Sequence, residues 1–185
     1  MDTPIAIEAP APKSGWFADV SAGPAFATYG AIDDAGISEH LATGGSAVAL
    51  GAGYGFDLLP FRLDLGVRVQ HYRFGVRGSY NAEKRDDSFR ATYDYVFPTL
   101  TATITTKLRS RVNVLGGVSL GTATFISDPQ GGSVHARQLP VYGTFEAGLE
   151  LTATEWLAVR AVVAWLPPFE ALNVVSPTLG LRARF

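Results

Sequence analysis

The sequence predicts an all-β protein, an eight-stranded antiparallel up-and-down transmembrane β-barrel. Apolar residues recur at every second position in segments of about ten to fifteen residues, the period of a strand with one apolar face. No run approaches the roughly 20 apolar residues that a membrane-spanning helix needs. Short and long connections alternate between the segments, as they do at the two rims of a transmembrane barrel.

The eight segments divide the chain after its first residues. The short connections are Leu59-Pro60, 107–110 and 152–155, and the long ones are 29–44, 77–88, 127–137 and 167–173. An even number of strands that closes on itself leaves no unpaired edge in lipid. The expected strands are 15–28, 45–58, 61–76, 89–106, 111–126, 138–151, 156–166 and a last one that ends at Phe185.

The first three strands show the alternation clearly. In the first, Trp16, Val20 and Phe26 alternate with polar or small residues that include Asp19. In the second, the even positions from 48 to 58 are apolar and the odd ones are mostly glycine. In the third, apolar residues from Phe61 to Val69 alternate with three charged ones, and the phase slips near 72–74, which predicts a β-bulge. The charged residues of this strand are Arg62, Asp64 and Arg68.

The remaining strands follow the same rule. In the fourth, Leu100 and Ile104 face away from a row of threonines, although Pro98 cannot donate to a ladder. In the fifth, valines alternate with Asn113 and small residues. In the last three, apolar residues alternate with a few charged ones, which are Glu146, Glu150, Arg160, Arg182 and Arg184.

Composition limits what the protein can do. A net charge of −2 gives no electrostatic basis for binding nucleic acid, which needs a concentrated basic face. The absence of cysteine excludes a disulfide framework and thiolate metal sites. We expect residues 1–14, with Pro4, Pro10 and Pro12, to form a flexible periplasmic tail before a barrel at 15–185. No basic-then-apolar leader opens the sequence, so for an exported protein we expect Met1 to replace a removed signal peptide.

The carboxyl terminus supplies a resemblance to a known class. The chain ends Leu179-Gly-Leu-Arg-Ala-Arg-Phe185, an alternating strand closed by an aromatic residue. This ending resembles the terminal signature by which bacterial outer-membrane β-barrels reach their assembly machinery, and the likeness is to the small OmpA/OmpX-like barrels. The resemblance implies a Gram-negative outer membrane, periplasmic termini, an insertion signal at Leu179, Leu181 and Phe185, and the barrel-assembly machinery as a partner during insertion.

Aromatic residues gather at both ends of the expected strands. Trp16, Phe61 and Trp156 fall at the short-turn ends, whereas Tyr93, Tyr95 and Trp165 fall at the long-connection ends. Two such girdles are expected where rings lie at the lipid–water boundaries. A soluble lipocalin-like barrel, with apolar residues inside, has the same alternation. The terminal Phe and the girdles favour the membrane orientation.

In that orientation the polar faces line the interior, which eight strands make just wide enough for side chains to fill. Strand pairing is expected to bring Arg160 between Glu146 and Glu150, and Arg182 and Arg184 near Asp19. Buried charges need partners, so we expect ion pairs to plug the lumen. The predicted network comprises Asp19, Arg62, Asp64, Arg68, Glu146, Glu150, Arg160, Arg182 and Arg184. A gated or narrow ion path is the alternative.

Catalytic chemistry has little support in the sequence. His40, His71 and His135 lie in different segments, without the clustering that a metal or nucleophilic site needs. Outer-membrane lipid A deacylases resemble this chain in scale, but their His-x-Ser pattern on a strand is missing. We therefore predict no enzymatic activity, no cofactor and no metal.

Basic residues near the long connections suggest a lipid partner. Arg73, Arg77, Arg90 and Arg137 lie near the outer rim, where they could pair with lipopolysaccharide phosphates or simply form a solvated rim. The sequence thus predicts an outer-membrane protein with a structural or surface-interaction role, in contact with outer-membrane lipid. A narrow pore or conduit for small solutes is the alternative, a lipid-modifying enzyme the third possibility, and the ligand of the loops is not identified.

Overall fold

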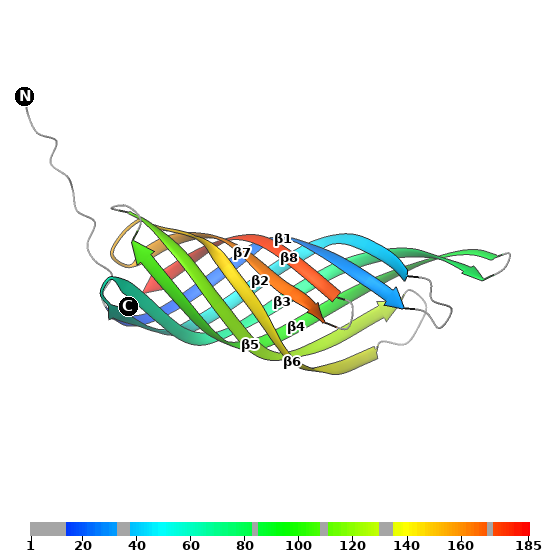
Figure 1. The fold of residues 1–185 in the computed structure, drawn as a ribbon, viewed down its shortest axis with the longest axis horizontal. Coiled ribbons are helices and arrows are strands. Elements are labelled where there is room, and N and C mark those ends of the chain that lie inside the picture. The colour runs from blue at the N-terminus through cyan, green and yellow to red at the C-terminus, as the bar shows by residue number, and fades with distance from the viewer. Residues whose placement is uncertain (1–13, 33–37, 83–84, 108–110, 130–134, 170–171) are drawn as a thin grey trace, which may run out of the picture.

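The computed structural model describes residues 14–32, 38–82, 85–107, 111–129, 135–169 and 172–185. Each strand pairs with its sequence neighbours and β8 pairs with β1, so the sheet closes into an antiparallel barrel (Figure 1). This confirms the predicted fold class. The strands are β1 Gly15–Ile32, β2 Ser38–Leu58, β3 Phe61–Ala82, β4 Arg85–Lys107, β5 Val112–Pro129, β6 His135–Thr152, β7 Leu157–Phe169 and β8 Leu172–Arg184.

The stagger of the strands sets the width of the barrel. Paired residues can be followed once around the wall along the path Trp16, Tyr54, Leu65, Ala102, Val118, Phe145, Trp165, Val175 and Phe26. The path returns to β1 ten residues beyond its start, at Phe26 instead of Trp16. With usual strand spacings, this stagger corresponds to a strand tilt of about 40°. Such a barrel has room for side chains inside and little else.

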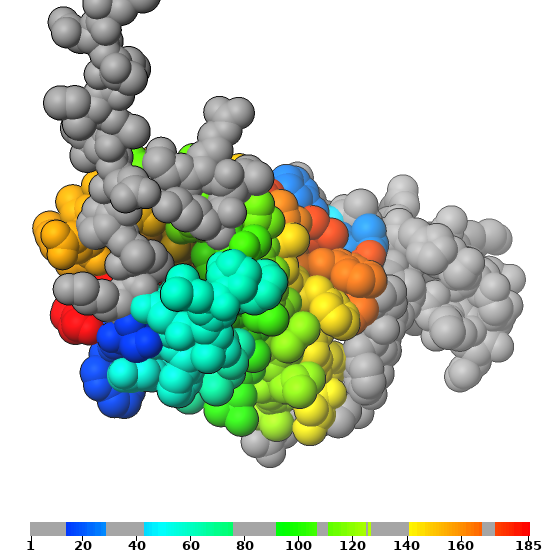
Figure 2. All heavy atoms as spheres, turned by 60° about the vertical axis from the view of Figure 1, so that its left-hand side comes forward, coloured from blue at the N-terminus to red at the C-terminus, as the bar shows by residue number. Residues whose placement is uncertain are grey.

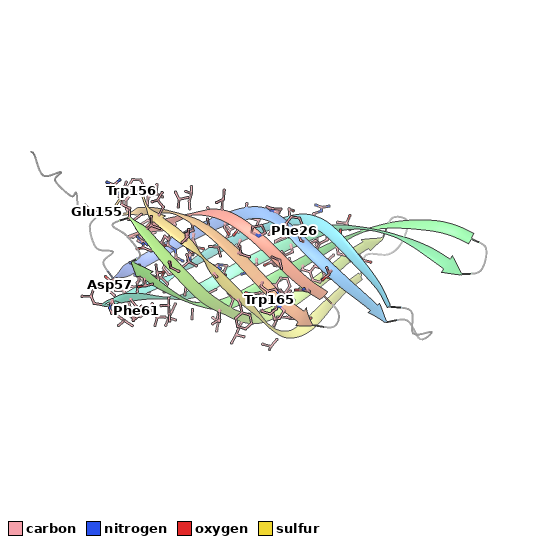
Figure 3. All side chains as sticks on the ribbon, turned by 45° about the horizontal axis from the view of Figure 1, so that its top comes forward. Phe26, Asp57, Phe61, Glu155, Trp156 and Trp165 are labelled. Carbon is pink, nitrogen blue, oxygen red and sulfur yellow. The ribbon has the colours of Figure 1, made fainter. Side chains whose placement is uncertain are left out.

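The orientation of the side chains separates a membrane barrel from a lipocalin-like one. Leu100 is 69% exposed and Leu179 is 68% exposed, whereas Arg182 and Glu150 are 1% and 0% exposed. Apolar side chains therefore project from the wall (Figure 3), and the burial of the charged ones shows that they point inward. The described residues include no helix long and apolar enough to cross a membrane.

The strands are longer than the sequence predicted. The ladders continue through most of the expected long connections, to the pairs Ile32–Ser38, Ala82–Arg85, Ser127–His135 and Phe169–Leu172. The hairpin of β3 and β4 reaches furthest beyond the rest of the wall (Figure 1). The apolar alternation ends where a lipid-facing surface is no longer needed, but backbone pairing does not depend on it. The predicted boundaries were therefore too short.

The bulge predicted near 72–74 is wrong. The β3 register runs without a shift through Phe74, which is the partner of Gly45 on one side and Tyr93 on the other. Tyr72 and Phe74 are simply apolar residues on the inner face, with 4% and 0% exposure. Among the described pairs, register shifts occur instead between Thr122 and Ala123 and between Leu166 and Phe169.

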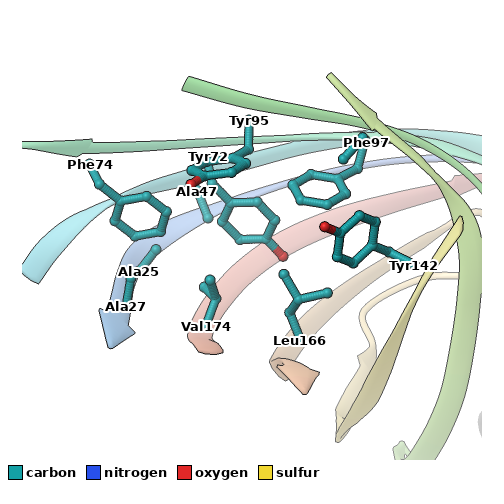
Figure 4. Packing of buried hydrophobic residues seen from close by; sticks show 11 residues of the cluster. Ala25, Ala27, Ala47, Tyr72, Phe74, Tyr95, Phe97, Tyr142, Leu166 and Val174 are labelled. Atoms are coloured by element: carbon teal, nitrogen blue, oxygen red, sulfur yellow. The ribbon is translucent and has the colours of Figure 1, made fainter. Parts of the chain in front are cut away.

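The inner face changes character along the barrel axis. Toward the long-connection end lies an inner aromatic layer, which we define as Tyr72, Phe74, Tyr95, Phe97 and Tyr142 (Figure 4). Its rings meet at centroid distances of 5.5 Å for Tyr72–Phe97, 5.9 Å for Phe97–Tyr142 and 6.2 Å for Phe74–Tyr95. Small side chains on other strands, among them Ala25, Ala27, Ala47 and Ala123, leave room for these rings.

The inner aromatic layer corrects part of the girdle prediction. Tyr95 is 5% exposed and belongs to this layer, and Tyr93 is partly buried and packed against it. Both residues lie at odd-numbered positions of β4, like the inward-facing Thr99 and Thr103. Their position near the strand end suggested a lipid-facing girdle, but the phase of the strand turns Tyr95 inward.

Candidate functional site

The inner charged residues lie below the aromatic layer, toward the short-turn end of the barrel. Of the nine predicted residues, Asp19 lies on β1 and the other eight lie on β3, β6, β7 and β8. Alternation turns each side chain inward, and apart from Asp19 none is more than 9% exposed. All nine residues predicted for the network lie in this part of the interior.

Asp19 is the centre of the network. Its Oδ2 accepts a hydrogen bond from Arg182 Nη2 at 2.7 Å and another from Arg160 Nη1 at 3.3 Å. Arg68 Nη2 lies 3.7 Å from the same oxygen. The Arg182 guanidinium also lies 4.0 Å over the ring of Phe17, where a cation–π contact is favourable. One carboxylate thus contacts three guanidinium groups from three different strands.

The other ion pairs extend from this centre to both sides. Arg182 donates to Asp64, which also accepts from Arg62 Nε at 2.7 Å. Arg62 Nη1 reaches Asp57 at 3.9 Å, and Asp57 is the most exposed member of the network. On the other side, Arg68 donates to Glu146 and Arg184 donates to Glu150, whose Oε2 is 3.7 Å from Arg160 Nε.

The connected network therefore balances its charges. It joins five arginines to five carboxylates, the fifth being Asp57. This balance matters because an uncompensated charge in a low-dielectric interior is costly. Asp57 was not among the predicted residues. Its signal was available in the sequence, since Asp57 and Arg62 flank the Leu59-Pro60 turn and are ladder partners.

Individual partners differ from those expected. Arg160 contacts Glu150 but reaches across to Asp19, and Glu146 pairs with Arg68 instead, because the ladder places Glu146 opposite Ala164. Arg184 was expected near Asp19 but binds Glu150, whereas Arg182 is the ladder partner of Asp19.

A small cavity of about 30 Å³ separates the charged network from the aromatic layer. Arg68, Glu146 and Arg160 border it on the charged side, and Gln70 and Tyr72 on the other. This is room for about two or three water molecules, since each needs roughly 10–15 Å³ of such volume. Among the described atoms, Glu146 Oε2 and Arg160 Nη2 have no hydrogen-bond partner, so water in this cavity could satisfy them.

The predicted insertion signal and the remaining girdle residues lie on the outer wall. Leu179, Leu181 and Phe185 are 68%, 50% and 80% exposed. The backbone N–H of Phe185 donates to Trp16 O at 2.9 Å, which brings the carboxyl terminus beside the start of β1 (Figure 2).

The outer aromatic residues mark both ends of the apolar wall. Phe61 and Trp156 lie near Asp57 and Glu155 at the short-turn end, and Trp165 lies toward the other end (Figure 3). Trp16 is also exposed at the short-turn end. Rings next to charged turn residues are typical of a lipid–water boundary.

His71 lies on the outer wall, away from the charged interior. Its Nε2 is 2.8 Å from Asp94 Oδ1, and Arg73 Nε is 4.0 Å from the same oxygen. The described residues contain no group of three His, Asp or Glu side chains arranged to hold a metal ion. The side chains of His40 and His135, like those of Arg77, Arg90 and Arg137, lie outside the described part of the chain.

Comparison with known proteins gives a match in structure alone. No family model matches the chain, and no curated protein matches it. Neisserial surface protein A is 18% identical, with a TM-score of 0.59 over 92% of this chain and 97% of its own. OprG from Pseudomonas aeruginosa is 15% identical, with a TM-score of 0.51 over 94% and 97%. Ail from Yersinia pestis is 16% identical, with a TM-score of 0.48 over 92% and 99%.

At these identities the likeness concerns the fold. It agrees with the closed eight-stranded sheet described above. The chain has the fold of the small β-barrel proteins of bacterial outer membranes.

Proposed function

We propose that the protein is a non-enzymatic component of a Gram-negative outer membrane, with a structural or surface-interaction role and a lumen closed to solutes. The observation that supports this role best is the double filling of the interior. A balanced ionic network occupies the short-turn half, and the inner aromatic layer occupies the half above it. A barrel filled in this way is a rigid platform for the surface that its longer hairpins present.

The fold and the terminal resemblance support one orientation in the membrane. Both termini and the short turns belong on the periplasmic side, with the long hairpins outside the cell. Outer-membrane lipid surrounds the apolar wall, and the barrel-assembly machinery inserts the chain with Leu179, Leu181 and Phe185 as its signal. The predicted periplasmic tail, residues 1–14, lies outside the described residues except for Ser14.

The proposed closure can be tested by electrical recording. We expect the protein to be silent in planar lipid bilayers, because the rings of Phe97 and Tyr142 block the interior above the network. The double substitution Phe97→Ala with Tyr142→Ala removes both rings and is expected to produce unitary currents. Phe145→Ala is the matched control, since its ring is 50% exposed on the outer wall of the same region. Steady unitary conductance of the unaltered protein would contradict a closed lumen.

A narrow conduit is the second candidate, and the cavity between the two layers favours it. The cavity borders Arg160 and Glu146, whose unpartnered atoms offer a polar path for water. A conduit would give currents that change with Glu146→Ala or Arg160→Ala, whereas a closed barrel would stay silent with either substitution.

A further inference from the structure

A groove of about 360 Å³ lies on the outer wall at the long-connection end of β8, β1 and β2. Its apolar part is formed by Phe26 and Val175, which are 55% and 38% exposed. Its polar part is formed by Thr28, Thr43 and Asn173. This volume and this mixture of apolar surface with a few polar groups are typical of a small-ligand site.

Two of the polar residues are held in place by their neighbours. Thr43 Oγ1 donates to the backbone oxygen of Gly75 at 2.6 Å. Asn173 Oδ1 accepts from the indole N–H of Trp165 at 2.9 Å, which leaves the amide N–H groups of Asn173 as donors. The groove thus combines fixed polar groups with the exposed ring of Phe26, which lies on the same half of the barrel as Trp165 (Figure 3). An aromatic face beside hydrogen-bonding groups suits a sugar ring better than an acyl chain.

The wall next to the groove is bare. A Cβ atom added at Gly44 or Gly75 would meet no heavy atom within 4 Å. Arg73 lies beside this bare part of the wall, because its ladder partner Ser46 is two residues along β2 from Gly44. Diagonal neighbours of this kind are roughly 7–8 Å apart, within the reach of an arginine side chain. The guanidinium can therefore reach the edge of the groove.

Arg73 is well suited to bind an anion at this point. Its side chain is 62% exposed and its Nε is 4.0 Å from Asp94, beyond hydrogen-bond distance. An arginine on the lipid face of a barrel costs about 2–4 kcal/mol at the bilayer midplane but roughly 0–1 kcal/mol at the interface, where lipid phosphates lie. Asp94 Oδ1 lies 2.8 Å from His71 Nε2. The negative charge of Asp94 repels an anion bound to Arg73.

From these contacts we propose that the groove and Arg73 form a site for one phosphorylated glycolipid of the outer leaflet. The sugar ring packs on Phe26 and over Gly44, with Thr28 and Asn173 as hydrogen-bonding groups, and a phosphate binds the Arg73 guanidinium. The site rests on the outer-membrane placement proposed above and names one lipid-binding surface within it.

The site can be tested with the full chain folded in detergent micelles, by native mass spectrometry and by the thermal shift on adding lipid. The probes are bis-phosphorylated lipid A, its dephosphorylated form and phosphatidylglycerol. We expect lipid A to be retained and to raise the melting temperature. We expect at least tenfold weaker binding of the dephosphorylated form, because it lacks the group that Arg73 binds, and of phosphatidylglycerol, because it lacks the sugar.

Substitutions with opposite signs make the test specific. Arg73→Ala is expected to weaken lipid A binding at least tenfold, Arg73→Lys to restore part of it, and Asp94→Asn to strengthen it by removing the opposing charge. Gly44→Trp should block the groove. Gly116→Trp is its matched control, because a Cβ there meets its nearest atom at 3.9 Å on another part of the wall. Arg111→Ala is the control for Arg73, being exposed near the opposite rim.

Each outcome decides the proposal. Unchanged lipid A binding by Arg73→Ala or by Gly44→Trp would overturn it, as would equal binding of all three lipids. The substituted residues lie on the outer wall or, for Arg111, at the short-turn rim, and a heat-modifiable band on gels verifies that each variant is folded. A protein that fails to bind lipid A but stays silent in bilayers would contradict only the lipid site. A protein that conducts but still binds lipid A would contradict only the closed lumen.

Discussion

Asp19→Asn is expected to be among the most destabilising single substitutions in the interior. The change keeps the shape of the side chain but removes the charge that faces Arg68, Arg160 and Arg182. Arg182 keeps Asp64 and Arg68 keeps Glu146, so Arg160 loses the most, retaining only Glu150 at 3.7 Å. Removing one partner of a buried ion pair costs about 3–5 kcal/mol. We expect a loss of this size in the free energy of unfolding.

Urea titration in lipid vesicles, followed by tryptophan fluorescence, measures this loss. Asp57→Asn is the matched control, because Asp57 belongs to the same network but is 28% exposed and lies 3.9 Å from Arg62. Because Asp57 is partly open to solvent and Arg62 keeps Asp64 at 2.7 Å, the expected loss is smaller, about 1 kcal/mol. Combining Asp19→Asn with Arg160→Met should recover part of the loss, since the uncompensated charge is then removed as well. A loss below about 1 kcal/mol for Asp19→Asn would refute the central role of this carboxylate.

Three further substitutions test the fold. Leu100→Arg places a charge on the lipid face and should cost about 2–4 kcal/mol in vesicle unfolding, whereas Thr28→Arg near the outer rim should cost about 0–1 kcal/mol; equal costs would contradict the proposed membrane level. Gly121→Ala brings a Cβ into collision with the backbone oxygen of Pro98 and should lower the yield of heat-modifiable barrel, whereas Gly75→Ala, whose Cβ meets no atom within 4 Å, should not. Phe185→Ser should reduce the insertion rate in cells but leave the stability of the folded barrel nearly unchanged, because the Phe185 side chain is 80% exposed. A fall in both the insertion rate and the stability would mean that Phe185 has a structural role.

The fold was predictable because one rule, apolar residues outward, applies along most of every strand. The outer positions of Leu100 and Leu179 and the inner positions of Glu150 and Arg182 follow from period-two alternation. The members of the charged network could be predicted as well, since a charged residue on the inner face of a strand points into the lumen. Asp57 was missed although its ladder partner Arg62 could be inferred from the turn.

The partners within the network were not predictable from pairing of neighbouring strands. Arg160 on β7 reaches Asp19 on β1 past β8, and Arg68 on β3 reaches Glu146 on β6 across the lumen. These contacts depend on the ten-residue stagger of the barrel and on the length of the arginine side chains. Neither can be read from the alternation of apolar and polar residues.

The inner aromatic layer was missed because the rule of apolar residues outward reverses at this level: Tyr72, Phe74 and Tyr95 point inward, whereas polar side chains lie on the outer face. A signal did exist. Arg73 and Asp94 occupy the phase that is apolar lower on β3 and β4, which shows that the strands leave the lipid there without changing phase.

The two fillings of the interior should therefore have separable roles. The ionic network holds strands together through cross-barrel contacts, and its Asp57 end is open to solvent, so water can reach it from the short-turn rim. The aromatic layer has no charges and excludes water at the opposite end. Asp19→Asn is then expected to lower stability without opening a path for ions, because the rings remain. The Phe97→Ala and Tyr142→Ala pair is expected to open a path while the ion pairs persist. Currents through Asp19→Asn barrels at low urea would show that the network, and not the rings, is the barrier.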